Sequence, residues 1–460
     1  MAPKSILALA LLVVLVSFSH GITALVSSSP PPFNGSGGGG FSLRVIANHQ
    51  PVHYDLASLQ RAKEQVKCRI KHQILPTFDE IRPFMCPLDD MVYGVTVAVG
   101  TGDGLQNYQL ALDMGGGLSW MQCLPCRSCR PQLNPVFDPT KSPTFSTVSA
   151  NNHLWCRPPY HALPNGACGF HIAYRDATGA SGYLVRDTFS FPTGNNQFVP
   201  LPGIVFGCAH SIERFHNHDT AAGILGLAMG PLGKPPTAFT EQVLPAHGRR
   251  FSYCPFKPGT SLYSYLRFGN DIPSHPPPGV PRQSTLVLAP ARNSEAYFVK
   301  LAGVSIGVNR LRSVTPNMFR RTAHGTGGCV IDIGTKMTAF VHAAYVHIEQ
   351  AVRQHLEHHG AHIVVVRGHK CVQQPAPHHN ILPSMTLHFE NGAWLRVMPE
   401  HVFMPLVVSG HHYQCLGFVS STDLTVIGAR QQVNHRFIFD LHDTIPIMSF
   451  NAEDCHLEGA

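Results

Sequence analysis

The chain has few charged residues: Asp, Glu, Lys and Arg make up 13% of its 460 residues. Long amphipathic helical patterns are also few, whereas glycine (41) and proline (38) are plentiful, and this combination is typical of an all-β protein with many turns. The net charge is +7, but the basic residues are scattered, and no Lys/Arg run or basic-aromatic patch indicates nucleic acid binding. The composition therefore favours an all-β body without a nucleic acid partner.

Apolar runs long enough to cross a membrane are absent after the first residues. Residues 1–24 carry Lys4 and an apolar core from Ile6 to Val16, which is too short for a bilayer, and small residues follow it. We interpret this stretch as a signal peptide. The C-terminal end lacks the apolar tail of a lipid-anchor signal. The sequence therefore predicts entry into the secretory pathway, with the extracellular space or the vacuole as destination, and no membrane partner.

Cysteine and histidine are both frequent. Thirteen cysteines in a secreted chain predict a disulfide framework with at least one thiol left over, and their spacing does not fix the pairs. The 29 histidines include the clusters His355-His358-His359-His362 and His411-His412. Transition metals bind histidine, but no carboxylate or cysteine accompanies these clusters, so we interpret them as a surface bias and expect no metal or cofactor.

The segment 25–88 differs from the rest of the chain. Residues 27–40 form a low-complexity linker that contains the glycosylation sequon at Asn34, and residues 55–74 have the pattern of a basic helix. After this segment, residues 92–99 alternate like a first strand, and residues 343–358 are the best helix candidate. We therefore expect the folded body to begin at about residue 89.

Two stretches share one pattern: Asp113-Met114-Gly115 and Asp332-Ile333-Gly334 each follow an apolar pair. Each predicts a strand that runs into a tight turn, where Gly115 and Gly334 permit a positive φ or a close backbone approach. Downstream, Gly223–Leu227 and Thr425–Ala429 both contain an apolar pair that ends in glycine. Such self-similarity predicts that the chain contains two related lobes. Facing each other, these lobes would bring Asp113 and Asp332 together across a cleft.

These motifs resemble the pepsin-like aspartic proteases, in particular the plant nepenthesin-like branch. The resemblance runs from about Tyr93 to Cys455 and includes Gln122–Cys126, Phe137–Pro139, Ile204–Cys208, Gly223–Leu227, Phe251–Cys254 and Gly325–Gly328. It implies a bilobal, all-β pepsin-like fold with a few short helices. The N-terminal lobe, 89–290, would carry the first aspartate and a flap, and the C-terminal lobe, 291–460, the second aspartate.

The resemblance also implies a function. It identifies Asp113 and Asp332 as catalytic, Tyr174 as the flap tyrosine, and Trp120 as its hydrogen-bonding partner. Two close carboxylates share a proton, so that one takes a proton from water while the other hydrogen-bonds the scissile carbonyl. The implied partner is a protein or peptide substrate in the cleft of a monomer. Segment 25–88 would then be a propeptide, whose basic helix complements an acidic cleft.

The turns depart from the family pattern. Met114 and Ile333 stand where the family has hydroxyl residues that hold the two turns in register, and Gly116 replaces a serine that supports the first carboxylate. Thr335 keeps the counterpart for the second, which predicts an asymmetric pair with the first aspartate less supported.

Other departures lie outside the two turns. Arg175 and Ala177 replace flap glycines, and Cys329 is an additional cysteine three residues before Asp332. Two functions follow. The first is a secreted aspartic endopeptidase, possible because both aspartates are present. The second is a catalytically weak or inactive pepsin-fold binding or inhibitor protein, suggested by the lost hydroxyls.

Overall fold

The computed structural model describes residues 84–89, 92–174, 177–192, 198–214, 221–230, 234–258, 264–288, 294–322, 325–373, 381–442 and 445–455. The signal peptide, the linker with Asn34, the basic helix at 55–74 and Arg175 lie outside these residues. The described part is built mostly of β-strands, as the composition predicts, and they form two β-rich lobes.

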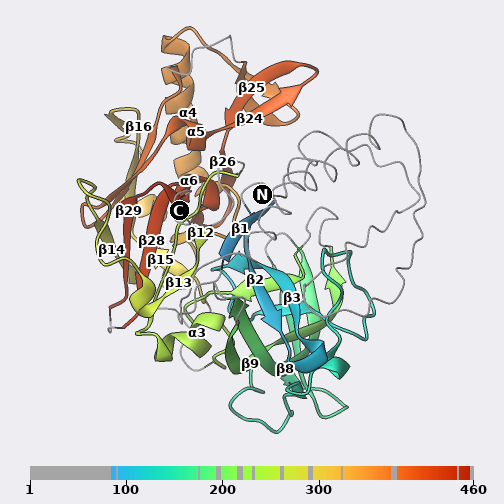
Figure 1. Ribbon diagram of the computed structural model, residues 1–460. Helices are drawn as coiled ribbons and strands as arrows, with labels where there is room; N and C mark the ends of the chain where they lie inside the picture. Colours follow the sequence, from blue (N-terminus) through green and yellow to red (C-terminus); the bar gives the residue numbers. More distant parts are fainter. Residues whose placement is uncertain are drawn as a thin grey trace, which may run out of the picture. The chain divides into compact units, whose positions relative to one another are not determined.

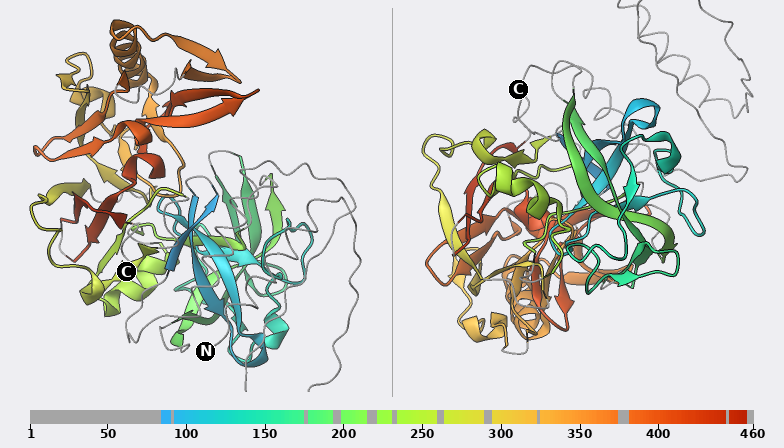
Figure 2. Two further views of the ribbon diagram at one scale, coloured as in Figure 1. Left: turned by 45° about the horizontal axis from the view of Figure 1, so that its top comes forward. Right: turned by 90° about the horizontal axis from the view of Figure 1, so that it is seen from below.

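The N-terminal lobe contains one large sheet (Figure 1). In spatial order its described strands are β12 (Ser264–Tyr265), β1 (Phe84–Asp89), β2 (Val92–Val99), β3 (Gln106–Asp113), β10 (Gly223–Gly226), β4 (Trp120–Gln122), β9 (Phe198–Glu213), β8 (Gly179–Pro192), β7 (Cys168–Ala173) and β6 (His161–Ala162), with β5 (Ser146–Thr147) paired to β8. The strand predicted at 92–99 is confirmed as β2, but it is not the first strand, because β1 precedes it and pairs with it, so the sheet begins before residue 89. Strand β2 pairs with both β3 and β8, so that blue and green strands lie side by side in Figure 2.

The second large sheet contains the following strands, in spatial order: β13 (Arg267–Phe268), β11 (Arg250–Tyr253), β28 (His435–Asp440), β29 (Ile447–Ala452), β14 (Gln283–Leu288), β15 (Tyr297–Val299), β18 (Cys329–Ile331), β27 (Thr425–Ile427), β19 (Thr338–Val341) and β26 (Phe418–Ser421). Three of these strands, β11, β13 and β14, precede residue 290. The expected lobe boundary at 290/291 therefore falls inside one continuous sheet, between the paired strands β14 and β15.

Two four-stranded sheets complete the C-terminal lobe. Their strands are β17 (Asn309–Arg310), β16 (Leu301–Ile306), β22 (Met385–Phe389) and β23 (Trp394–Val397) in one, and β20 (Ile363–Val366), β21 (His369–Gln373), β25 (His411–Leu416) and β24 (Phe403–Val408) in the other. The described α-helices are α3 (Phe239–Val243), α4 (His342–His358), α5 (Pro399–Val402) and α6 (Ala429–Gln432). Helix α4 confirms the predicted helix because Ile348, Val352 and Leu356 form its buried face.

The duplication predicted from the motifs is present in the strand order. In the first sheet the order β3-β10-β4-β9 runs parallel, antiparallel and parallel between neighbours. In the second sheet β18-β27-β19-β26 repeats this order and these directions. In each lobe a distant strand, β10 or β27, inserts between the strands before and after the aspartate turn.

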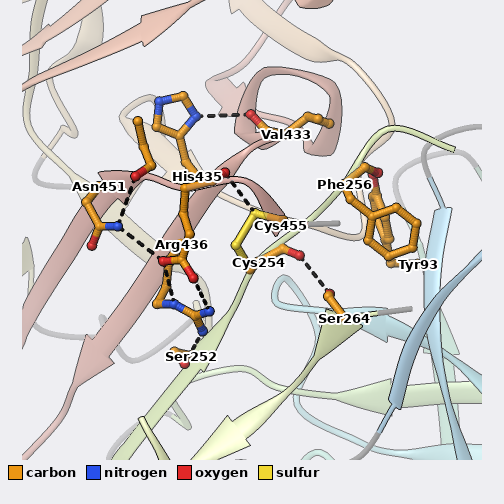
Figure 3. Close-up of a disulfide and its surroundings, with 12 residues drawn as sticks. Tyr93, Ser252, Cys254, Phe256, Ser264, Val433, His435, Arg436, Asn451 and Cys455 are labelled. Atoms are coloured by element: carbon orange, nitrogen blue, oxygen red, sulfur yellow. Dashed lines mark hydrogen bonds and ion pairs between the residues drawn. A yellow bond between two sulfur atoms is a disulfide. The ribbon is translucent and has the colours of Figure 1, made fainter. Parts of the chain in front are cut away.

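Disulfides link both local and distant parts of the chain. The described pairs are Cys123–Cys208, Cys126–Cys129, Cys156–Cys168, Cys254–Cys455 and Cys371–Cys415, which agrees with the predicted disulfide framework. Cys329 is a free, buried cysteine. Figure 3 shows how Cys455 holds the C-terminal segment against Cys254, beside Arg436 of β28.

The histidine clusters form no metal site within the described residues. The rings of His355 and His359 lie 4.5 Å apart at the end of α4, and Nδ1 of His359 bonds to the carbonyl of His355 at 2.7 Å. The described part of the chain contains no group of three or more His, Cys, Asp or Glu side chains arranged to hold a metal ion. Its helices include none that is long and apolar enough to cross a membrane.

Candidate functional site

Asp113 and Asp332 occupy equivalent places in the two lobes. Asp113 is the last residue of β3, and its carbonyl accepts a hydrogen bond from the N–H of Leu227 at 2.7 Å, just after β10. Asp332 directly follows β18, and its N–H donates to the carbonyl of Ile427 in β27 at 3.1 Å. The inserted strand therefore fixes the backbone of each aspartate from the side.

The two turns approach each other closely. The backbone N–H of Met114 donates to Oδ1 of Asp332 at 3.2 Å. A β-carbon placed on Gly334 would lie 3.0 Å from the carbonyl oxygen of Leu112 and 3.2 Å from the α-carbon of Asp113. The structure therefore brings both carboxylates into one site, through contacts between residues that are 218 positions apart.

The sequence suggested two reasons for glycine at positions 115 and 334: a positive φ and a close backbone approach. The first reason is wrong. Neither glycine has a positive φ, so the turns do not need left-handed backbone at these positions. The second reason is confirmed for Gly334, because any side chain there would press on the backbone of the opposite turn. Each glycine also donates its N–H to the preceding aspartate, Gly115 to Oδ1 of Asp113 at 2.7 Å and Gly334 to Oδ1 of Asp332 at 2.8 Å.

Asp332 receives three hydrogen bonds and is 8% exposed. Its Oδ1 accepts from the N–H groups of Met114 and Gly334, and its Oδ2 accepts from the hydroxyl of Thr335 at 2.6 Å. Hydrogen bonds from several donors stabilise negative charge on a buried carboxylate. These three donors fix the orientation of the Asp332 carboxylate within the site.

Asp113 has a different environment. Burial, followed by the charge of Asp332, raises its pKa to about 7, while the N–H groups of Gly115 and Gly116 act in the opposite direction and the charge of Glu295 raises the pKa further. A β-carbon on Gly116 would lie only 2.7 Å from Oδ2 of Asp113, so the carboxylate occupies the space of a side chain there. The expected asymmetry is therefore present in the contacts: Asp332 receives the side-chain hydroxyl bond of Thr335, whereas the Asp113 carboxyl faces Gly116.

Apolar packing replaces the missing hydroxyls of the turns. Met114 and Ile333 are both completely buried and belong to the same hydrophobic core cluster. The connection across the turns is instead made by the backbone N–H of Met114. Replacing both members of a hydrogen-bonded pair by apolar groups leaves no polar group unpaired, so the loss costs less than removing one partner.

A second pair of hydroxyls supports the turns, and the sequence interpretation missed it. The N–H of Gly226 donates to the hydroxyl of Ser119 at 3.0 Å, and the N–H of Gly428 donates to the hydroxyl of Thr338 at 3.1 Å. Both hydroxyl residues follow their aspartate by six positions. This shared spacing was a signal in the sequence. It reveals the pair only when the two motifs are extended beyond their glycines.

Tyr174 and Trp120 lie beside the first turn. Tyr174 follows β7, at the start of the connection to β8, and its hydroxyl accepts a hydrogen bond from Nε1 of Trp120 at 2.7 Å. A β-carbon on Gly116 would lie 3.9 Å from Cε1 of Tyr174, which places the tyrosine ring next to the loop around Asp113. The hydrogen bond implied for this pair is therefore present, and the ring borders the loop that follows Asp113.

Sequence comparison relates the chain to plant proteins. Family models described as "Xylanase inhibitor N-terminal" and "Xylanase inhibitor C-terminal" match residues 93–270 and 296–445. Aspartic proteinase nepenthesin-2 of Nepenthes gracilis is 29% identical over 357 residues, 77% of this chain and 76% of the relative. Protein ASPARTIC PROTEASE IN GUARD CELL 2 of Arabidopsis thaliana is 28% identical over 417 residues, 87% of this chain and 82% of the relative.

Solved structures show the same fold. The basic 7S globulin from soybean superimposes with a TM-score of 0.60 at 18% identity, covering 82% of this chain and 97% of that chain. Conglutin gamma from lupine seeds gives a TM-score of 0.59 at 18% identity, covering 81% of this chain and 94% of that chain. With the family matches and the duplicated aspartate turns, these findings identify the chain as a member of the pepsin-like aspartic protease family, in its plant nepenthesin-like branch.

Proposed function

We propose that the protein is an aspartic endopeptidase in which Asp113 and Asp332 activate a water molecule to hydrolyse peptide bonds. The proposal rests on the hydrogen bond from the Met114 N–H to Oδ1 of Asp332, at 3.2 Å, which joins the two turns. It also rests on the different environments of the two carboxyls, since burial and the charge of Asp332 raise the pKa of Asp113. One proton shared by two unlike carboxyls supplies both a general acid and a general base.

The hydrogen bonds suggest a role for each acid. Asp332, with its three donors, accepts a proton from the attacking water. Asp113, whose pKa is raised to about 7, keeps its proton and donates a hydrogen bond to the scissile carbonyl. The water oxygen adds to the carbonyl carbon. The C–N bond then breaks as Asp332 passes the proton that it took from the water to the leaving nitrogen. No covalent bond forms between protein and substrate.

Tyr174 is proposed to close over the substrate and exclude water. Its hydroxyl is already oriented by Trp120, so the ring is held beside Gly116 before a substrate binds. Gly115 and Gly334 orient the carboxylates through their N–H groups.

Thr335 is the one side-chain hydroxyl among the described residues that bonds to either aspartate of the pair. Thr335→Val removes this donor and keeps the volume, and we expect kcat to fall by about 10- to 100-fold because the base loses one of its supports. Thr335→Ser retains the hydroxyl and should stay close to wild type. Steady-state cleavage of a fluorogenic peptide measures both variants, and equal rates in the valine and serine variants would contradict this role.

The raised pKa of Asp113 predicts the pH dependence. The active form needs a proton on Asp113, so kcat/KM should be high in acid and decline as pH rises through about 7. The same proton is bound in the native but not in the unfolded protein between pH 3.8 and about 7, so its contribution to stability also declines as pH rises through that window. Cleavage of an unfolded protein substrate from pH 3 to 9 tests this decline of activity. A statine-type inhibitor, which imitates the tetrahedral species, should block the cleavage. A folded protein without cleavage at any pH overturns the proposal.

A second candidate is a binding or inhibitor protein of the same fold. It is favoured by the apolar Met114 and Ile333, by Gly116, and by family models that carry the description of xylanase inhibitors. This function requires no proton transfer, so the aspartate variants would bind their partner like wild type. Binding of a xylanase or another protein without any peptide cleavage would support it.

The cellular setting is also a proposal. Disulfides form in oxidising compartments, so the described pairs support passage through the secretory pathway, with cleavage of residues 1–24 and removal of a propeptide within 25–88. We propose that the monomer acts on protein or peptide substrates in the cleft between the N-terminal and C-terminal lobes, without a cofactor.

A further inference from the structure

Glu295 lies beside the loop that follows Asp113, although no sequence motif includes it. Its backbone carbonyl accepts a hydrogen bond from the N–H of Met229 at 2.9 Å. Two residues later, the hydroxyl of Tyr297 donates to the carbonyl of Leu227 at 2.7 Å. These bonds attach the start of β15 to the segment after β10, so the backbone of Glu295 is held in place.

The carboxylate of Glu295 is positioned directly over Gly117. A β-carbon placed on Gly117 would overlap its Oε2, so this oxygen occupies the space where a side chain would be. The ring of Tyr174 borders the preceding residue, Gly116, where a β-carbon would lie 3.9 Å from its Cε1. Consecutive α-carbons are about 3.8 Å apart. Glu295 and the flap tyrosine therefore border the same short loop, next to the Asp113 carboxyl.

The charges around Glu295 are unbalanced. Lys234 is the one described cation paired with it, with Nζ 3.6 Å from Oε1, which is longer than a charge-assisted hydrogen bond. Burial is the main cause of the raised pKa values of Asp113, Glu241 and Tyr160, and the negative charge of Glu295 raises all three further. The side chains of Glu295 and Lys234 are 25% and 30% exposed, so solvent can reach them.

We propose that Glu295 makes the cleft beside the 115–117 loop selective for a lysine or arginine side chain of the peptide substrate. A cation from the substrate would supply the short hydrogen bonds that the loose pair with Lys234 does not, and a carboxylate has room for several donors. A neutral side chain would leave the partly buried charge of Glu295 paired only with Lys234. This inference rests on the proposed peptidase function, and it names the substrate class of that site.

The test compares peptides that carry lysine or its neutral analogue norleucine at each position around the scissile bond. At one position the wild type should prefer lysine by roughly tenfold in kcat/KM, and high salt should weaken the preference. Glu295→Gln keeps the shape and removes the charge, so it should abolish the preference. Lys234→Met removes the competing cation, so it should increase the preference.

A matched control is Glu390→Gln, which breaks another exposed Lys–Glu pair, with Lys300 at 3.3 Å, just before β16 and just after β22. It should leave the preference unchanged. A wild type without lysine preference, or an unchanged preference in Glu295→Gln, overturns the role of Glu295 while the peptidase function stands. If Asp113→Asn cleaves like wild type, the peptidase function itself fails. The dissociation constants of statine-type peptides with lysine or norleucine then still decide whether Glu295 selects cations.

Discussion

Asp332→Asn is expected to lower kcat by about 10³- to 10⁴-fold, the largest effect of any single substitution considered for this protein. Asparagine keeps the shape of the side chain but cannot take a proton from water. The three donors around this position, from Met114, Gly334 and Thr335, would face a neutral amide. The effect should therefore appear in kcat, with little change in KM, because the group acts on water rather than on bound substrate.

Asp113→Asn should have a related but distinct effect. The amide retains a hydrogen-bond donor that imitates the protonated carboxyl, so substrate binding should persist, whereas a proton can no longer pass to the carbonyl oxygen as the tetrahedral species forms. The residual rate should no longer decline through about pH 7, because the carboxyl whose pKa lies there is gone. Asp440→Asn, which removes an exposed partner of Arg250 (3.2 Å), is a control that should match wild type.

Single-turnover cleavage of a fluorogenic peptide from pH 3 to 9 measures all three variants, and chemical denaturation confirms that each is folded. If either aspartate variant retained more than a tenth of the wild-type rate, that residue would not be one of the two catalytic acids. If only Asp332→Asn lost activity, the shared-proton mechanism would be wrong, and a single-base mechanism would replace it.

The duplication could be predicted from the sequence because its signals are local. An apolar pair, an aspartate and a glycine describe one strand and its turn, and the later Gly-Ile-Leu-Gly stretch describes one more strand, β10. Helix α4 was predictable for the same reason, since its apolar residues recur on one face. Each of these features depends on residues that are close in the sequence.

Other features depend on contacts between distant residues, and the sequence did not reveal them. The backbone N–H of Met114 bonds to Asp332, and a backbone donor leaves no mark on residue type. The carboxylate of Glu295 lies over Gly117 because β15 packs beside the first turn, 178 positions later in the chain. The positive φ expected at the turn glycines is wrong for the same reason, since a neighbouring backbone rather than local strain excludes a side chain at Gly334.

Breaking the buried ion pair of Arg436 is the second large effect that we expect. Arg436 of β28 is 1% exposed, and its guanidinium bonds to both carboxylate oxygens of Glu453, at 2.9 and 2.6 Å (Figure 3 shows the surroundings). Glu453 lies two residues before Cys455, whose disulfide to Cys254 ties the C-terminal segment to β11. Arg436→Met should lower the free energy of unfolding by about 3 kcal/mol, because it leaves a mostly buried carboxylate without its partner.

The size of this effect depends on burial rather than on the ion pair as such. Arg353 and Glu349 on α4 are equally close, at 2.7 Å, but the Arg353 side chain is 38% exposed, so Arg353→Met should cost less than about 1 kcal/mol.

The double variant Arg436→Met/Glu453→Met removes both charges and should regain most of the stability lost in the single variant. Urea denaturation followed by circular dichroism measures all of these variants. A double variant as unstable as Arg436→Met alone would mean that packing of the long arginine side chain, and not the unpaired carboxylate, is responsible. Because β28 connects through β29, β14 and β15 to β18, which carries Asp332 at its end, the same loss of anchoring should also lower the temperature at which peptide cleavage stops.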